Sequence, residues 1–141
     1  MATEATTGTQ TLNAAGHQFQ INLAAVTKLK ILSYDYVSSA GGQVLATIDG
    51  LDGYIERVVF VPGTGDDAPS ANSDWILKDQ YGIDALAGDG ENRSATLTQS
   101  VTAYQTRNDT DHSFPNVGTM TVTGSAVGAA NGMTLHIYVR E

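Results

Sequence analysis

The stretch from Trp75 to Gln99, WILKDQYGIDALAGDGENRSATLTQ, holds the only tryptophan of the chain and decides the predicted fold. Its first residues alternate, so Trp75 and Leu77 lie on one face of a predicted strand and Ile76 and Lys78 lie on the other. The whole stretch predicts a strand, a glycine-punctuated reversal and a second strand.

The reversal inside this stretch is predicted to carry a small core of its own. Gly82 allows a turn that a residue with a Cβ would resist, and we expect Ile83, Leu86 and Ala87 to pack as an apolar plug beneath it. The alternation of Ser94 to Thr98 predicts the second strand. The spacing matches no catalytic loop, so we interpret the stretch as a connection between strands.

Residues 26–37 form another alternating segment, and here both faces of the predicted strand are partly apolar. Leu29 and Ile31 share one face. The opposite face takes Lys30, Leu32, Tyr34 and Tyr36. Two partly apolar faces are typical of a strand that a neighbour covers.

Residues 133–140 show the most regular alternation of the chain. The inward positions are Met133, Leu135, Ile137 and Val139, and the outward positions are Thr134, His136, Tyr138 and Arg140. Further alternating segments predict strands at residues 19–23, 43–48, 54–61, 97–104 and 119–123. Segments rich in Gly, Pro, Asp and Ser predict turns and loops at residues 38–42, 49–53, 62–73, 105–116 and 124–132.

No segment sustains the apolar period of a helix, and about eight short strands follow one another at regular spacing. This pattern predicts an all-β fold, an antiparallel two-sheet β-sandwich with a jelly-roll-like topology. The order of the strands in space stays open.

Residues 1–18 consist largely of Thr, Ala, Gln and Gly and contain little that a core could bury. Because such a segment has no core of its own, we expect an extended N-terminal arm that lies on another chain. Residues 19–141 then form a single β-sandwich domain, and a domain of this size buries roughly 70% of the surface of its unfolded chain.

The composition disfavours several classes of function. The chain has no cysteine, which excludes a disulfide framework, a zinc–thiolate site and a thiol nucleophile. Its formal charge is −8 and its 7 basic residues are scattered along the sequence, which disfavours binding to phosphate backbones. The start MATEATTGTQ lacks the pattern of a signal peptide, and no window approaches the roughly 18 apolar residues of a membrane span. We therefore expect a soluble protein made in a cytoplasm, with neither nucleic acid nor membrane as a partner.

His17, His112 and His136 are the candidates for acid–base chemistry. His17 lies in the arm and His136 on the polar face of the last strand, while His112 lies beside Asp109 and Asp111. No serine stands in a G-x-S-x-G elbow, and a nucleophile needs a base within hydrogen-bond reach. We expect solvated or structural histidines, no catalytic residue and no enzymatic activity.

Several acidic segments offer the oxygen ligands that Ca²⁺ prefers. They are Asn108-Asp109-Thr110-Asp111-His112, Asp49-Gly50-Leu51-Asp52 and Asp66-Asp67. The EF-hand spacing is absent and these residue types are ordinary in turns, so we expect turns without metal or cofactor, although a Ca²⁺ site in one of them stays open. Gly88-Asp89-Gly90 precedes a predicted strand and Gly63-Thr64-Gly65 precedes two aspartates, so neither suits a phosphate, and both predict turns.

The aromatic residues allow two interpretations, a sugar-stacking platform on an open face or core and cross-strand pairs. They are Tyr34, Tyr36, Tyr54, Tyr81, Tyr104, Tyr138 and Trp75. The strand pattern favours the core for most of them, with Tyr138 as the best candidate for the surface.

A motif of strand and turn positions, W-x-L-x-D-x-x-G-x-D-x-L-x-G-x-G-x-N-x-S, occupies Trp75, Leu77, Asp79, Gly82, Asp84, Leu86, Gly88, Gly90, Asn92 and Ser94. It is followed by Pro-x-x-Gly at 115–118, a Thr/Val strand at 119–123, a glycine-rich turn and L-x-I-Y at 135–138. Together these features, over about half of the chain, resemble small β-proteins encoded in the structural-gene clusters of tailed bacteriophages, close to the major capsid gene. Several such proteins are capsid decoration, or cement, proteins.

This resemblance implies a non-enzymatic virion structural protein that binds the outside of a phage capsid and stabilises it. The implied partner is the major capsid protein, the implied oligomer is a homotrimer on a local three-fold axis, and the implied location is the capsid surface after synthesis in the host bacterial cytoplasm. The arm at residues 1–18 could add backbone pairing to a neighbour's sheet edge. The acidic surface would face solvent or complement a basic patch on the shell.

Two other roles stay open at the level of sequence. A tail or head-completion component of the virion predicts hexameric or dodecameric rings. A carbohydrate-binding module of a fibre or spike predicts an exposed row of aromatics, with Tyr34, Tyr36 and Tyr138 as the residues to test.

Overall fold

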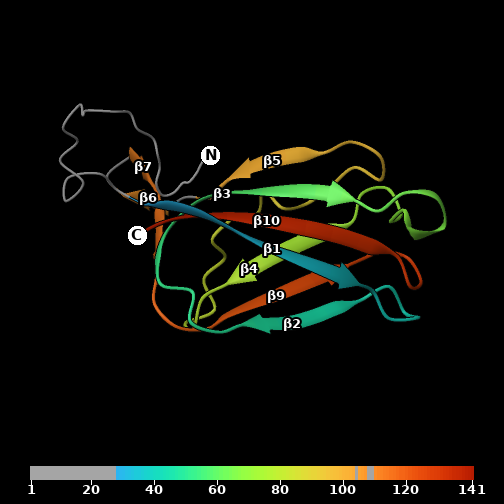
Figure 1. Cartoon of the computed structure of the whole chain (residues 1–141), viewed down its shortest axis with the longest axis horizontal. Helices are drawn as coiled ribbons and strands as arrows, with labels where there is room; N and C mark the ends of the chain where they lie inside the picture. Colours follow the sequence, from blue (N-terminus) through green and yellow to red (C-terminus); the bar gives the residue numbers. More distant parts are fainter. Residues whose placement is uncertain (1–27, 104, 108–109) are drawn as a thin grey trace, which may run out of the picture.

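The computed structural model of the chain describes residues 28–103, 105–107 and 110–141. Eight strands form two antiparallel sheets that pack face to face (Figure 1), so the predicted all-β sandwich is confirmed. The predicted arm at residues 1–18 and the predicted strand at 19–23 lie outside the described residues.

The larger sheet has the strand order β1-β10-β3-β5, and β8 also pairs with β3. Its strands are β1 (Leu29–Val37), β3 (Gly53–Pro62), β5 (Gln99–Thr102), β8 (Phe114–Asn116) and β10 (Gly132–Arg140). The smaller sheet has the order β2-β9-β4. Its strands are β2 (Val44–Ile48), β4 (Asp74–Lys78) and β9 (Met120–Ser125).

From β1 to β5 the strands alternate between the two sheets. β1, β3 and β5 belong to the larger sheet, β2 and β4 to the smaller one, and the chain returns through β9 to β10 between β1 and β3. This winding is that of a jelly roll. The remaining elements are the 3₁₀ helix η2 (Gly65–Asp67) and a hairpin of β6 (Gln105–Arg107) and β7 (Thr110–His112).

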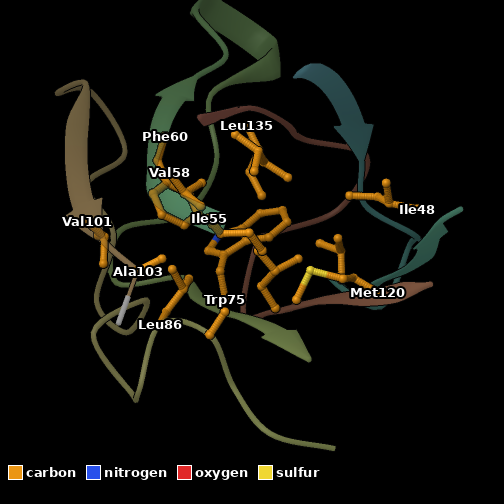
Figure 2. Close-up of a cluster of buried hydrophobic side chains, with 14 of the residues drawn as sticks. Ile48, Ile55, Val58, Phe60, Trp75, Leu86, Val101, Ala103, Met120 and Leu135 are labelled. Carbon is orange, nitrogen blue, oxygen red and sulfur yellow. The ribbon is translucent and has the colours of Figure 1, made fainter. Parts of the chain in front are cut away.

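The core lies between the sheets and is made by the inward positions of both. In the larger sheet Leu135 pairs with Phe60 and Ile137 with Val58, and all four side chains are buried. The smaller sheet contributes Trp75, whose ring centroid lies 6.2 Å from that of Phe60 (Figure 2). The tryptophan therefore joins the two layers, as its inward position predicted.

The predicted second strand, from Ser94 to about Tyr104, contains β5, but its predicted start is wrong, because β5 begins only at Gln99. The hydroxyl oxygen of Ser94 accepts hydrogen bonds from the backbone N–H groups of Thr96 and Leu97, and the side chain of Gln99 accepts one from the N–H of Ser94. These local bonds give the backbone an alternative to sheet pairing, so the alternating segment forms a turn.

Two further local expectations need correction. The residues that pack beneath the turn are Ala85 and Leu86, whereas Ile83 and Ala87 are exposed. The predicted loop at residues 105–116 contains the β6–β7 hairpin and β8. β8 joins the sheet because Phe114 is buried and the buried Asn116 donates a hydrogen bond from Nδ2 to the carbonyl of Leu51, at 2.7 Å.

Candidate functional site

The motif that begins at Trp75 is a structural unit that satisfies its own polar groups. Asp84 accepts hydrogen bonds from the backbone N–H groups of Leu77, Leu86 and Gly88, at 3.2, 3.0 and 2.9 Å. The indole N–H of Trp75 donates to the hydroxyl of Ser73, at 3.0 Å. The carboxylate of this motif therefore holds a turn together, and its geometry gives no sign of a reaction.

The outer edge of β4 is covered by the same segment of chain. The N–H of Trp75 donates to the carbonyl of Gly90, and the N–H of Ala85 donates to the carbonyl of Leu77. A Cβ on Gly90 would lie 2.1 Å from the carbonyl oxygen of Trp75, so only glycine allows this close approach. The predicted turn at 88–90 is confirmed and it caps a sheet edge.

The outer face of the larger sheet presents a different kind of surface. The antiparallel register sets Leu29, Arg140 and Tyr54 in one row across β1, β10 and β3. The next row holds Ile31, Tyr138, Arg57 and Thr102 across β1, β10, β3 and β5. We call the first three residues of each row the arginine–tyrosine patch: Leu29, Ile31, Tyr54, Arg57, Tyr138 and Arg140.

Within the patch, each arginine stacks on a tyrosine. The guanidinium carbon of Arg57 lies 4.2 Å from the ring centroid of Tyr138, and that of Arg140 lies 4.7 Å from the centroid of Tyr54. A cation over an aromatic face is held by the electrostatic field of the ring. Each arginine of the patch therefore has a position that an aromatic ring helps to fix.

Large apolar side chains of the patch are open to solvent. Leu29 is 59% exposed, Ile31 is 51% exposed and Tyr54 is 45% exposed. A shallow groove crosses the patch, lined by Leu29, Glu56, Arg57, Thr102, Tyr138 and Arg140. Exposed apolar groups gathered around aromatic and arginine side chains are typical of surfaces that bind another protein.

A β-bulge in β3 determines which charged side chains of this face lie next to each other. Tyr138 pairs with Arg57 and Val139 with Ile55, so Glu56 is the extra residue between them. Its carboxylate accepts a hydrogen bond from Nε of Arg140 at 2.5 Å and another from the hydroxyl of Ser113 at 2.8 Å. The bulge thus gives Arg140 a carboxylate partner inside the chain.

The pKa of Glu56 reflects these contacts. Burial alone would raise this pKa, but the hydrogen bonds from Arg140 and Ser113, together with the charge of Arg140, hold it below its usual value. The carboxylate therefore stays ionised and neutralises Arg140 well into the acidic range.

The fold gathers basic residues that are scattered in the sequence. The start of β1, the start of β3 and the end of β10 lie at one end of the larger sheet (Figure 1). Four of the 7 basic residues lie there: Lys28, Lys30, Arg57 and Arg140. With Asp52, Glu56 and Glu141 this end carries a formal +1 in a chain of −8, so the other residues carry −9.

The ion pairs at this end hold strand ends together. The ammonium group of Lys30 lies 2.6 Å from a carboxylate oxygen of Glu141, next to the pairing of β1 with β10. The hydrogen bond from Lys30 holds the pKa of Glu141 below its usual value. Both side chains are well exposed, so this pair adds little stability.

The histidines do not assemble a catalytic group among the described residues. Nδ1 of His136 lies 2.6 Å from the hydroxyl of Ser33, its cross-strand partner on the exposed face. The carboxylate of Asp35 instead accepts a hydrogen bond from Thr134, at 2.6 Å. His112 lies in β7, and His17 lies outside the described residues.

The three predicted ion-binding segments differ in structure where they are described: Thr110–His112 form β7, residues 49–52 connect β2 to β3, and Asp66-Asp67 lie in η2. Asp52 accepts a hydrogen bond from the N–H of Gly118 at 2.7 Å, and Asp49 accepts one from the hydroxyl of Thr119 at 3.2 Å. Asp66 and Asp67 lie in η2, which begins at Gly65. No group of three potential metal ligands comes together within the described part of the chain, and Asn108 and Asp109 lie outside it.

The aromatic residues do not form one row. Tyr34 and Tyr36 point to the inner side of β1 and pack against the core, where the ring centroid of Tyr36 lies 6.3 Å from that of Trp75. Tyr138 lies on the opposite face of the same sheet. The three residues named for sugar binding are therefore split between two faces, and Tyr104 lies outside the described residues.

Sequence reasoning named only Tyr138 as a surface aromatic, which is wrong for Tyr54 and Tyr81, because these two are 45% and 79% exposed. It placed Arg140 on the outward face of its strand but did not bring the patch together. The signal that could have found it is the pairing of β1, β10 and β3, because outward positions of one strand mean little until their neighbours are known. Arg57 is the clearest case, since a bulge decides which side chain it faces.

Comparisons with known proteins add little to this picture. No family model and no curated protein matches the chain. Among solved structures it is similar to a chain in the structure of infectious bursal disease virus, Gx strain, with 13% identity and a TM-score of 0.29. The match covers 82% of this chain and 37% of that one, so this chain spans little more than a third of its length. A TM-score of this size does not establish a shared fold.

Proposed function

We propose that this chain is a non-enzymatic virion structural protein that attaches to the outside of a phage capsid and stabilises the shell. The observation that carries the proposal is the arginine–tyrosine patch, in which exposed Leu29 and Ile31 border two stacked arginine–tyrosine pairs. Tyrosine and arginine are the residue types that contribute most to the affinity of protein interfaces.

The scaffold beneath the patch suits a binding role. β10 pairs with both β1 and β3 over nearly its whole length, so Tyr138 and Arg140 stand on a strand that is paired on both sides. Side chains that are already fixed lose little conformational entropy when a partner binds. The patch is therefore preorganised for a partner of fixed shape, such as a capsid shell.

The identity of the partner rests on a separate argument. The sequence from Trp75 to Arg140 resembles small proteins encoded near phage capsid genes, and that resemblance names the major capsid protein as the partner and a homotrimer as the assembly. The acidic remainder of the chain would then face solvent, and neither nucleic acid nor membrane is a partner in this proposal. The only helix in the described residues is η2, so no helix there could cross a bilayer.

No observation favours the carbohydrate-binding alternative. Tyr34 and Tyr36 pack against the core, and Arg57 covers one face of the Tyr138 ring. A sugar that stacks on Tyr138 would have to displace the guanidinium or use the other face of the ring.

The test is binding to undecorated capsids of the virus that encodes the chain. We expect the purified chain to co-sediment with these capsids in a saturable ratio and to scatter light as a trimer, alone or once released from the shell. The double variant Ile31→Ala with Tyr138→Ala should bind at least about tenfold more weakly. The matched control is Leu45→Ala with Thr123→Ala, which removes an exposed apolar group and its neighbour on the outer face of the smaller sheet.

A stable hexameric or dodecameric ring that ignores capsids would contradict the proposal and favour a tail or head-completion component. Equal loss of binding in the patch variant and in the control would contradict the assignment of the patch as the attached face.

A further inference from the structure

We infer that the arginine–tyrosine patch recognises a carboxylate on an acidic segment of its protein partner, and that Arg57 is the residue that binds it. The inference rests on the proposed function, because it names the chemistry of the partner at the same surface. It rests on a difference between the two patch arginines: Arg140 has a carboxylate partner, and Arg57 has none among the described side chains.

Arg140 already has its counter-ion. Glu56 accepts a hydrogen bond from Nε of Arg140, and Ser113 holds the other oxygen of the same carboxylate. Arg140 and Glu56 therefore neutralise each other within the chain. Without Glu56, the guanidinium of Arg140 and the hydroxyl of Ser113 would both lose their acceptor.

Arg57 has no such partner among the described side chains. Among the side chains that the structure describes, the ion pairs are Lys30 with Glu141 and Arg140 with Glu56. Arg57 is exposed, and its guanidinium stacks on Tyr138. A contact with an aromatic ring does not neutralise the guanidinium, and the N–H groups of a guanidinium match the two oxygens of a carboxylate.

The bulge at Glu56 is the reason for this difference. With the extra residue in β3, Glu56 reaches Arg140 while Arg57 faces Tyr138 in the next row. The sequence places Glu56 and Arg57 side by side, where they could neutralise each other. The fold separates them, so Arg57 lies over Tyr138 and has no carboxylate partner within the described part of the chain.

The surroundings of Arg57 define the rest of the ligand. Thr102 is its cross-strand neighbour on β5 and lines the same groove. Leu29 lines the groove on its other side, next to the exposed Ile31. The groove therefore suits a segment that places an aspartate or glutamate at Arg57 and an apolar side chain toward β1.

Charge complementarity favours an acidic protein segment over nucleic acid. The patch end of the sheet carries a formal +1, while the other residues of the chain carry −9. A long polyanion would meet this negative charge on leaving the patch, whereas a folded shell can present its acidic groups only at the contact. The negative charge of the residues outside the patch end also disfavours binding to an acidic partner through another face of the chain.

The test is a charge reversal with a matched control. Arg57→Glu and Lys78→Glu change the net charge equally, but Lys78 lies on the smaller sheet, away from the patch. We expect Arg57→Glu to weaken capsid binding by about tenfold or more, and Lys78→Glu to leave it within about twofold. Arg57→Lys should be intermediate, because lysine keeps the charge and loses the planar fork. Equal effects of Arg57→Glu and Lys78→Glu would overturn the inference while leaving the proposed function intact.

A second measurement keeps the inference testable if capsids do not bind at all. The isotope-labelled full chain is titrated in NMR with acetyl-Leu-Asp-Leu-amide and with the isosteric acetyl-Leu-Asn-Leu-amide. We expect saturable shifts at Arg57, Thr102 and Tyr138 with the aspartate peptide, and shifts at least about fivefold weaker with the asparagine peptide. Equal responses to the two peptides would overturn the inference, as would binding of a single-stranded oligonucleotide that Arg57→Glu abolishes without any response to the aspartate peptide.

Discussion

Charged and aromatic side chains have different roles around β4 and on the outer face of the larger sheet. Around β4, the carboxylate of Asp84 is enclosed by three backbone N–H groups and the indole of Trp75 has a hydroxyl partner. On the outer face, Arg57 is exposed and lacks a carboxylate partner among the described side chains. The difference teaches where to look for function in a fold without an enclosed site: the polar groups that the chain satisfies itself maintain structure, and the oriented groups that it leaves open are available to a partner.

The largest effect should come from removing the side chain that joins the two layers. Trp75→Ala deletes an indole that is 1% exposed and packs on Phe60 and Tyr36, so we expect a loss of about 3–5 kcal/mol in the free energy of unfolding. Denaturant unfolding followed by circular dichroism measures it. A loss below about 1 kcal/mol would show that this region does not hold the sandwich together.

A smaller loss should follow removal of the carboxylate that holds the turn. Asp84→Ala leaves three backbone N–H groups without their acceptor, and we expect a cost of about 2–3 kcal/mol. Asp84→Asn keeps the oxygen that faces Leu77 and Leu86 and loses the one that faces Gly88, so its cost should be about half as large. If both variants unfold like the wild type, the turn does not depend on this side chain.

These two sites also show how far sequence reasoning reaches. The inward positions of Trp75 and Leu77 and the whole alternation of β10 were predictable, because a strand repeats its pattern every second residue and needs no knowledge of its neighbours. The turn at Ser94 was not predictable. The hydrogen bonds that its hydroxyl oxygen accepts stabilise a turn, although the alternation of residues 94–98 favours a strand. The patch was not predictable either, since Leu29, Arg140 and Tyr54 meet only through strand pairing between distant parts of the chain.

A moderate change of the opposite sign is expected at Tyr36. Its hydroxyl is buried without a hydrogen-bond partner among the described residues, and burial, with a further contribution from Tyr34, raises its pKa to about 12. Tyr36→Phe removes this hydroxyl and should raise the free energy of unfolding by up to about 1 kcal/mol at neutral pH. Because the folded state holds the proton more tightly than the unfolded state, the wild type should lose stability from pH 10.0 to about 12. Unfolding at a series of pH values checks this, and a variant that keeps the same loss would contradict the assignment to Tyr36.

The smallest effect on stability should come from the patch itself. Arg57→Ala and Tyr138→Ala remove side chains of the outer face that make no contact with the core, and each should change the free energy of unfolding by less than about 1 kcal/mol. The measurement is the same denaturant unfolding that serves Trp75→Ala. A cost of several kcal/mol would make the patch a structural element like the turn at Asp84 and would remove the contrast between the two regions.

The central claim is that the arginine–tyrosine patch, and no other face, binds the partner. Hydroxyl-radical footprinting of the chain, free and bound to undecorated capsids, tests this claim most directly. Reactive side chains lie on the patch and elsewhere: Leu29, Ile31 and Tyr54 belong to the patch, while Leu45 and Tyr81 are 77% and 79% exposed outside it. We predict that binding protects the three patch residues and leaves Leu45 and Tyr81 as reactive as in the free chain. Protection of Leu45 or Tyr81 with no change at the patch would contradict the account.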